Sequence, residues 1–401
     1  MPRRSHLPTL LANLSLAAVS AVVALGAAEL LLRAVVPPSR GYFVLPPGAD
    51  WTLVAAPGLL PGVEGVQHIR VNPSGVRGRT FGDDHAEYRI LAVGGSTTRC
   101  GSLDETEAWP HLLEAQLGST MDGRDVWVGN VGKDGATTRD HVLHLKYLLP
   151  QYPRIDAVVS LVGVNDMISA LQQGWQYRLP DPVTELGAER AQMRRAFFRV
   201  PGRLQDPPVN TIKPVPWYKA TALWQLGGRA KQAIPRSFRL EDLVRRGVRK
   251  ARYERHTAAA WVDSLPPLES PLVEYRRNLN AMADLAAKAG VRLVFVTQPS
   301  MWREGMSAAE QRFLVFGALV TLQPPPWAYY TTGALGRAMA RYNETLLDVC
   351  RIRHLDCVDA APRVPRDTTA LYDDVHFNAN GSRLLARALV EHFRTRPPFR
   401  R

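Results

Sequence analysis

Residues 88–98 of this 401-residue chain read YRILAVGGSTT: a short apolar run, two glycines, a serine and two threonines. The apolar run predicts a buried strand, and the glycines permit a tight turn into a helix. Such a turn exposes the hydroxyl of Ser96 and puts its backbone N–H at a helix N-terminus, where the helix dipole favours a developing anion. Ser96 is therefore placed like a nucleophile, with a plain helix cap as the alternative. A phosphate-binding loop would need a Gly-Lys-Ser/Thr ending, which is absent.

Strands and helices alternate on both sides of a long central segment. The apolar runs predict further strands at 126–131, 157–162 and 291–297, and helical spacing predicts helices at 108–117, 275–289 and 381–393. This alternation is typical of a parallel sheet with helices on both faces. We therefore expect an α/β fold.

Two more polar clusters follow predicted strands, at the position where open α/β sheets hold their active sites. The first, residues 130–138, reads NVGKDGATT, and its glycine spacing misses the dinucleotide fingerprint G-x-G-x-x-G. A glycine in this loop can instead present a backbone N–H. The second, residues 163–166, reads GVND and offers the side-chain amide of Asn165 as a donor. An Asx turn or helix cap is the alternative for this Asn-Asp pair.

A fourth cluster, residues 373–378, reads DDVHFN and precedes the last predicted helix. The carboxylate of Asp373, three residues before His376, can fold back to accept the Nδ1–H of the imidazole. That bond fixes the tautomer and leaves Nε2 free to take a proton from a serine. The cluster thus supplies the pair that a nucleophilic serine needs.

These four clusters, in this order, resemble the four sequence blocks of the SGNH (GDSL-type) hydrolase superfamily. The resemblance covers residues 88–170 and about 275–393. It implies a three-layer, flavodoxin-like parallel sheet and an ester hydrolase that needs no cofactor and no metal. It also assigns site residues: Ser96 as nucleophile and oxyanion N–H donor, Gly135 and Asn165 as the other oxyanion donors, His376 as general base and Asp373 as its orienting acid.

The match to the family leaves three points open. Gly95 stands where the named motif has Asp, which puts the subfamily and the fine geometry in question. Gly132 lies in the same loop as Gly135 and is an alternative second donor. Asp374 is an alternative to Asp373, although it lies only two residues before His376.

An apolar run at residues 7–36 is long enough to span a bilayer, which needs about 20 apolar residues. Arg3, Arg4 and the N-terminal amine stand at its front, against Arg33 and Arg40 at its end. This slight positive-inside bias keeps the N-terminus in the cytoplasm. We expect a cytoplasmic tail at 1–6, a single-pass anchor at 7–36 and an extracytoplasmic catalytic domain. The alternative is a signal peptide cleaved after Gly26 or Ala28.

The rest of the chain divides by composition. Residues 37–87 predict a Pro/Gly-rich spacer with a small β segment, in which 68–79 form two short strands. Residues 88–170 and 271–396 predict the hydrolase domain, and 171–270 a basic helical insertion. Aromatic side chains of the insertion are predicted either to line a substrate cleft or to form the insertion's own core; they include Trp175, Trp217, Trp224 and Trp261.

Composition excludes some classes of protein. With 46% hydrophobic and 22% charged residues the chain is neither a disordered nor a multi-span membrane protein. The net charge of +13 fits either an anionic partner or a biased genome composition, and the exported location disfavours nucleic acid. Cys350 and Cys357 are close enough in sequence to form a disulfide outside the cytoplasm. Together with His354 they also have metal-like spacing, but a structural zinc site wants four ligands.

The sequence therefore predicts an extracytoplasmic serine esterase that removes acetyl or other short acyl groups, in the first instance from a glycan. An acyltransferase would use the same site, because only the acceptor in the second half-reaction differs. Small acylated molecules and lipids are further candidate substrates. A catalytically idle polysaccharide-binding module is the alternative from another class, although such a module has no use for Asp373.

Overall fold

The computed structural model describes residues 7–35, 41–82, 86–201, 218, 221–224, 226–227, 236–238, 243–319 and 325–399. Its centre is a five-stranded sheet in the order β11-β8-β5-β3-β4, with every neighbouring pair parallel. The strands are β3 (Glu87–Gly94), β4 (Asp125–Asn130), β5 (Ala157–Leu161), β8 (Arg292–Val296) and β11 (Asp356–Val358). The expected parallel α/β sheet is confirmed.

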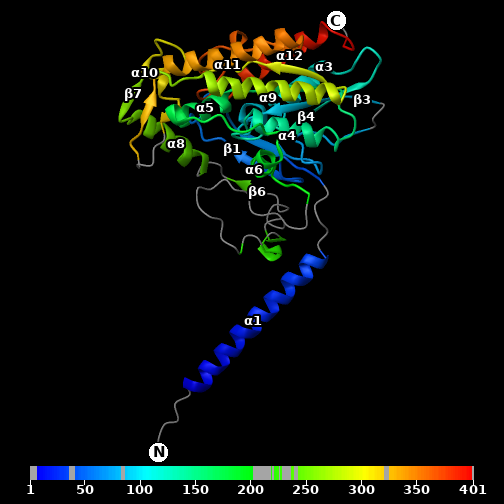
Figure 1. The fold of residues 1–401 in the computed structure, drawn as a ribbon, viewed down its shortest axis with the longest axis vertical. Helices are drawn as coiled ribbons and strands as arrows, with labels where there is room; N and C mark the ends of the chain where they lie inside the picture. The colour runs from blue at the N-terminus through cyan, green and yellow to red at the C-terminus, as the bar shows by residue number, and fades with distance from the viewer. Residues whose placement is uncertain are drawn as a thin grey trace, which may run out of the picture.

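Helices cover both faces of this sheet, which is why every residue of β3 and β5 is buried. On one side α3 packs against α12, and on the other α9 packs against α4, α5 and α11 (Figure 1). Their bounds are α3 (Trp109–Leu117), α4 (Thr138–Leu148), α5 (Val164–Gln173), α9 (Glu269–Lys288), α11 (Thr332–Arg353) and α12 (Ala379–Arg394). These three layers, with their parallel sheet, are the arrangement that the resemblance to SGNH hydrolases implies.

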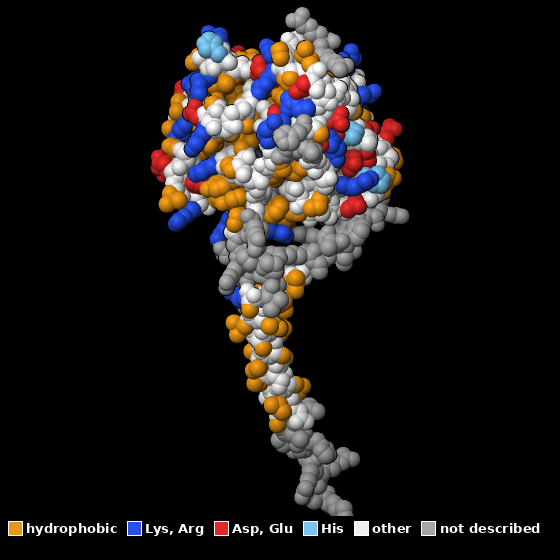
Figure 2. Space-filling view, turned by 90° about the vertical axis from the view of Figure 1, so that its right-hand side faces the viewer, with side chains coloured by type: hydrophobic (Ala, Val, Ile, Leu, Met, Phe, Trp, Pro, Cys, Tyr) orange, Lys and Arg blue, Asp and Glu red, His pale blue; other side chains and the backbone are white. Residues whose placement is uncertain are grey.

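The N-terminal helix α1 (Leu7–Val35) projects from the domain (Figure 1). Eight of its large apolar side chains, between Leu14 and Leu31, are 58–70% exposed along the stalk (Figure 2). Residues Ala12–Ala34 are long and apolar enough to cross a membrane. A signal sequence near an N-terminus has the same properties, so the helix is compatible with either of the expected fates.

The segment predicted as a spacer folds against the domain instead. It contains β1 (Asp50–Val54) and β2 (Val66–Arg70), which pair antiparallel, and β6 (Arg236–Phe238) from the predicted insertion pairs parallel with β1. Val44, Val63 and Val76 are buried in the main core, so their apolar surface holds this segment down. The two strands expected at 68–79 are only partly found, because beyond β2 a single bridge joins Val71 to Arg77.

The described parts of the predicted insertion are helical pieces and short strands. They are η1 (Gly174–Gln176), α6 (Leu186–Ala196), residues 222–224 and 226–227, α8 (Leu243–His256) and β7 (Ala260–Val262). The last of these pairs with β10 (Ala328–Tyr330), which also pairs with β9 (Ala318–Leu319). Trp217, one of the aromatic residues singled out above, lies outside the described residues.

Cys350, in the last turns of α11, and Cys357, in the edge strand β11, form a disulfide with their Cα atoms 6.2 Å apart. The bond uses both thiols of the Cys350-x3-His354-x2-Cys357 spacing, so these thiols cannot bind a metal while it is intact. Cys100 is buried and free.

Candidate active site

The predicted nucleophile lies at the start of α2 (Ser96–Arg99), immediately after β3. Glycine at position 94 is required, because a Cβ there would overlap Thr98 Oγ1 and come within 2.6 Å of the Leu161 carbonyl oxygen. Thr97 and Thr98 are buried under the turn. The strand end and the short helix therefore hold Ser96 at the carboxyl edge of the sheet.

A hydrogen-bonded chain of three side chains begins at this serine. Ser96 Oγ lies 2.7 Å from Nε2 of His376, and Nδ1 of His376 lies 2.8 Å from Oδ2 of Asp373. The carboxylate of Asp373 also accepts the backbone N–H groups of Val375 and His376, each at 3.0 Å. These local bonds fold the Asp-x-x-His loop back on itself, as its spacing predicted.

The electrostatics of this chain favour a charged acid beside the imidazole. Burial disfavours the imidazolium, but the negative charge and hydrogen bond of Asp373 outweigh it and raise the pKa of His376. Burial also disfavours the carboxylate, yet His376 and the backbone N–H groups hold the pKa of Asp373 below its usual value. The ring of Tyr372 stacks on the imidazole, 5.5 Å between centroids, and helps to fix its plane.

The raised pKa of His376 makes a testable prediction for the pH dependence of hydrolysis. A general base must be neutral to take the serine proton, so kcat/KM should rise with pH through the pKa of His376 in the free enzyme. We expect the midpoint of this acidic limb above the ordinary histidine value near 6.5. Hydrolysis of a small activated acetate, measured from pH 5 to 9, checks it, and a midpoint below 6.5 would contradict it.

Asp374, the alternative acid, faces another part of the fold. Its Oδ1 accepts the indole N–H of Trp302 at 2.7 Å, and its Oδ2 accepts the backbone N–H of Val315 at 2.6 Å. Burial raises the pKa of this carboxyl. Among the described residues its side chain has no hydrogen bond to His376, so the geometry favours Asp373 as the orienting acid.

The predicted oxyanion donors surround the serine. Asn165, the second residue of α5, donates one amide N–H to the Ala136 carbonyl at 2.9 Å, which leaves its second N–H for a ligand. Gly135 has a φ of +70° in the exposed loop before Ala136. Within the described part of the chain, the backbone N–H groups of Ser96 and Gly135 donate to no other residue.

Gly132, the alternative donor, has a packing role. Its N–H donates to Asn130 Oδ1 at 2.8 Å, and a Cβ at this position would come within 2.7 Å of the Thr98 backbone. The glycine is therefore needed for the close approach of the loop to α2. Gly135, which lines the cavity beside Ser96, is the better-placed donor.

A second contact ties the two oxyanion segments together. Asp166, next to Asn165, accepts the backbone N–H of Thr138 at 3.0 Å and its hydroxyl at 2.5 Å. Burial raises the pKa of Asp166 to about 7. The loop that carries Gly135 is thus fixed to the start of α5 at both Ala136 and Thr138.

This geometry predicts a large effect for Asn165→Ala. The substitution removes a donor that is fixed in position before the anion forms, and losing one such donor typically costs about 10²–10³ in kcat. We expect that loss with KM for a small acetate little changed. Because the variant also frees the Ala136 carbonyl, circular dichroism should establish that the fold is retained. A kcat within about twofold of wild type would exclude Asn165 from the oxyanion site.

These residues open into a cavity of about 580 Å³, whose polar and apolar lining residues are called its polar wall and its apolar wall. The polar wall holds Arg99, Asp134 and Ser102 beside Gly135 and Asn165, and the apolar wall holds Trp51, Leu53, Ile69, Phe316 and Tyr372. Trp51 and Leu53 share a face of β1, and Ile69 is the partner of Trp51 on β2. None of these three residues was predicted from the sequence: 50–54 were assigned to a spacer, and the strands expected at 68–79 were given no role in the site. For Trp51 and Leu53 the alternation in DWTLV was the available signal.

The described tryptophans of the insertion do not line this cavity. Trp261 packs near Arg255 and Tyr329, whereas Trp175 and Trp224 are 74% and 52% exposed. For these residues the predicted cleft role is not what the structure shows. The predicted insertion contributes to the site indirectly. Arg252 on α8 donates hydrogen bonds to the carbonyls of Leu59 and Tyr372, at 2.8 and 3.4 Å.

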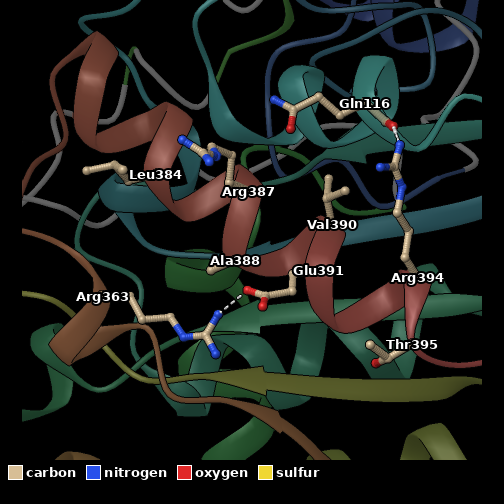
Figure 3. A pocket seen from close by; sticks show the side chains of 9 residues that line it. All are labelled: Gln116, Arg363, Leu384, Arg387, Ala388, Val390, Glu391, Arg394 and Thr395. Atoms are coloured by element: carbon tan, nitrogen blue, oxygen red, sulfur yellow. Dashed lines mark hydrogen bonds and ion pairs between the residues drawn. The ribbon is translucent and has the colours of Figure 1, made fainter. Parts of the chain in front are cut away.

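A larger hollow, about 920 Å³, lies along α12 and α3 (Figure 3). Arg363 pairs there with Glu391 at 2.6 Å, and Arg394 donates to the carbonyl of Gln116 at 2.6 Å. Its lining residues include no serine, cysteine or histidine. The lining of this hollow therefore offers no serine–histidine pair, and the smaller cavity over Ser96 is the candidate active site.

Comparisons with known proteins agree with the motifs. A model of the GDSL-like lipase/acylhydrolase family matches residues 92–384. Similar solved structures include an acetylxylan esterase from Geobacillus stearothermophilus (14% identity, 76% of this chain and 93% of that one, TM-score 0.37). A putative lipolytic protein of the G-D-S-L family from Desulfitobacterium hafniense is also similar (10% identity, 76% of this chain and 99% of that one, TM-score 0.37). An α/β hydrolase from the metagenome of Lake Arreo, Spain, is similar as well (13% identity, 76% of this chain and 94% of that one, TM-score 0.38).

A search of curated proteins finds no match. The family model spans well over half of the chain and includes all four motifs, from the turn at Ser96 to the loop at His376. The prediction of an SGNH-type hydrolase acting on ester bonds is therefore confirmed, and the chain belongs to the GDSL-like lipase/acylhydrolase family.

Proposed function

We propose that this chain is a membrane-anchored, extracytoplasmic serine esterase that uses Ser96, His376 and Asp373 to remove acetyl or other short acyl groups from a glycan. The observation that carries the catalytic part is the hydrogen-bonded chain from Ser96 Oγ through the imidazole to Asp373, at the base of the cavity. A nucleophile, a base and an orienting acid within hydrogen-bond reach are what acyl transfer requires.

The reaction has two half-reactions. Ser96 Oγ attacks the ester carbonyl as His376 Nε2 takes its proton, and the tetrahedral oxyanion is held by Ser96 N–H, Gly135 N–H and Asn165. The imidazolium then protonates the leaving alcohol, and an acyl-serine ester remains. Water attacks this ester with His376 again as base, which releases the carboxylic acid and restores the serine.

A glycan as the alcohol is supported by the polar wall of the cavity. Arg99, Asp134 and Ser102 lie beside the oxyanion donors and can exchange hydrogen bonds with sugar hydroxyls. The apolar wall favours a second candidate, an ester with a longer acyl chain such as a lipid. Hydrolysis rates for esters from two to ten carbons separate them, because each buried CH₂ should add about 0.8 kcal/mol of binding only if the wall holds the chain.

The proposed location is supported by α1. An apolar helix of this length with arginines ahead of it is typical of an anchor that leaves the following domain outside the cytoplasm. A reporter fused after Arg401 tests the orientation. Activity of the reporter only in the cytoplasm would overturn the proposed orientation. A mature N-terminus near Ala27 would show that α1 is a cleaved signal peptide and not an anchor.

Labelling by a fluorophosphonate tests the proposed chemistry. The probe phosphonylates an activated serine, so the intact chain should label and the Ser96→Ala chain should not. Labelled protein digested to peptides should carry the phosphonate on Ser96. Release of acetate from an acetylated oligosaccharide, compared with release from a lipid ester, then tests the substrate. Labelling at another serine would overturn the assignment of Ser96 as nucleophile. Release of the carboxylic acid only from the lipid ester would overturn the proposal of a glycan substrate.

A further inference from the structure

The helix α1 carries one carboxylate whose role an anchor alone does not explain. Glu29 pairs with Arg33 at 2.7 Å and accepts the backbone N–H groups of Ala222 and Leu223, at 2.8 and 3.0 Å. Its side chain is 16% exposed, whereas Leu30 and Leu31 beside it are 70% and 63% exposed. Glu29 therefore faces protein while its neighbours face outward.

The backbone N–H groups that Glu29 accepts come from a segment nearly two hundred residues away. Residues 222–224 form a short helical piece beside the end of α1 nearest the domain, green in Figure 1. A carboxylate in a membrane-spanning helix is costly unless protein groups satisfy it. Glu29 thus requires residues 222–223 to lie at its own depth.

That depth follows from helix geometry. Glu29 is six residues before the last residue of α1, Val35, which at about 1.5 Å per residue is roughly 9 Å along the axis. Interfacial helices bury their apolar faces about 5–10 Å into the boundary between headgroups and acyl chains. A segment bound to Glu29 is at that level when α1 spans the bilayer.

The exposed side chains next to this contact suit such a boundary. Tyr218, Trp224 and Leu226, the interfacial patch, are 40%, 52% and 40% exposed, and the rings of Tyr218 and Trp224 meet edge to face with centroids 5.1 Å apart. Tryptophan and tyrosine are enriched where a bilayer meets water, because their rings are apolar at one end and polar at the other.

We propose that the interfacial patch inserts into the outer leaflet of the bilayer, with Glu29 of α1 holding it there. The occupant of this surface is thus lipid, continuous with the lipid around the anchor. The proposal rests on the anchoring part of the proposed function. It also has a consequence for the site: β6, a later part of the same segment, pairs with β1, whose Trp51 and Leu53 line the cavity. The segment that contacts the bilayer is thus joined along the chain to the strand that pairs with the cavity-lining strand.

Depth-dependent quenching on the full chain tests this proposal. An environment-sensitive fluorophore is attached to Trp224→Cys in vesicles of phosphatidylcholine and phosphatidylglycerol, with Ile352→Cys, 67% exposed on α11, as the matched control. Cys100 is buried and the other two cysteines are paired, so the parent chain measures background labelling. We expect the emission of the fluorophore at 224 to shift to the blue and to be quenched by nitroxide lipids. The fluorophore at 352 should be quenched by aqueous iodide alone.

A third label distinguishes failure of the anchor from failure of the patch. Val19→Cys lies in the middle of α1 and should be quenched by nitroxides deep in the acyl chains. Deep quenching at 19 with iodide quenching at 224 would overturn the proposal and leave the anchor intact. No lipid quenching at 19 would overturn the anchor, and the proposal with it.

The role of Glu29 is tested by Glu29→Leu against Glu29→Gln. Leucine removes the acceptor and should lower lipid quenching at 224 without changing it at 19. Glutamine keeps one acceptor oxygen and should largely restore it. Fluorophosphonate labelling of each variant controls for folding of the catalytic domain. Equal quenching of the fluorophore at 224 by nitroxide lipids in the Glu29 chain and in both variants would show that Glu29 does not hold the interfacial patch.

Discussion

Replacing Ser96 by alanine should lower kcat for a small activated acetate by roughly 10⁶-fold, because the acyl-enzyme then cannot form. His376→Ala should cost about as much, since Ser96 Oγ, 2.7 Å from Nε2, has no other base beside it among the described residues. The double variant should be little worse than either single one, because serine and histidine act as one unit.

Ser102 supplies a matched control for this experiment. It lines the same cavity, and its hydroxyl receives a hydrogen bond from Tyr372 rather than from the base. Ser102→Ala should therefore retain hydrolysis of the small activated acetate and fluorophosphonate labelling. Wild-type turnover in Ser96→Ala, or loss of labelling only in Ser102→Ala, would move the nucleophile away from Ser96.

The sequence was most informative where a structure is determined locally. The strand of residues 87–94 and the turn after it were readable because a continuous apolar run meets two glycines that the packing requires. The Asp373–His376 contact was readable for a similar reason: both residues lie in one loop, and short bonds to Val375 and His376 N–H close it. Such features depend on neighbours along the chain.

The walls of the site depend on distant segments and were not predicted. Trp51 lines the cavity over Ser96 only because β1 pairs with β2 and both pack on the domain, and prolines around this stretch suggested a spacer. Phe316 reaches the cavity from a loop whose backbone is held by Asp374. The interaction of Glu29 with Ala222 likewise joins residues that no local pattern connects. In each case tertiary packing, not spacing, decided the outcome.

Substituting the two adjacent acids separately should give opposite results. Asp373→Asn should lower kcat by about 10⁴, because an amide does not hold the imidazole in the productive tautomer and cannot balance its positive charge. Asp373 is also what raises the pKa of His376, so the acidic limb of kcat/KM should move to lower pH in this variant. The free energy of unfolding should change by less than the activation free energy that corresponds to the loss in kcat.

Asp374→Asn should instead act on stability. The carboxylate accepts from Trp302 on one oxygen and from Val315 and Phe316 on the other, and an asparagine has only one oxygen to offer. At least one buried donor group is then left unpaired, and each costs about 1–3 kcal/mol. We expect a lower unfolding midpoint in urea, with kcat at 25 °C near wild type. The acidic limb should move less than in Asp373→Asn, because the charge of Asp374 contributes less than that of Asp373 to the raised pKa of His376. If Asp374→Asn lost the rate and shifted the limb while Asp373→Asn did neither, Asp374 would be the acid that orients His376.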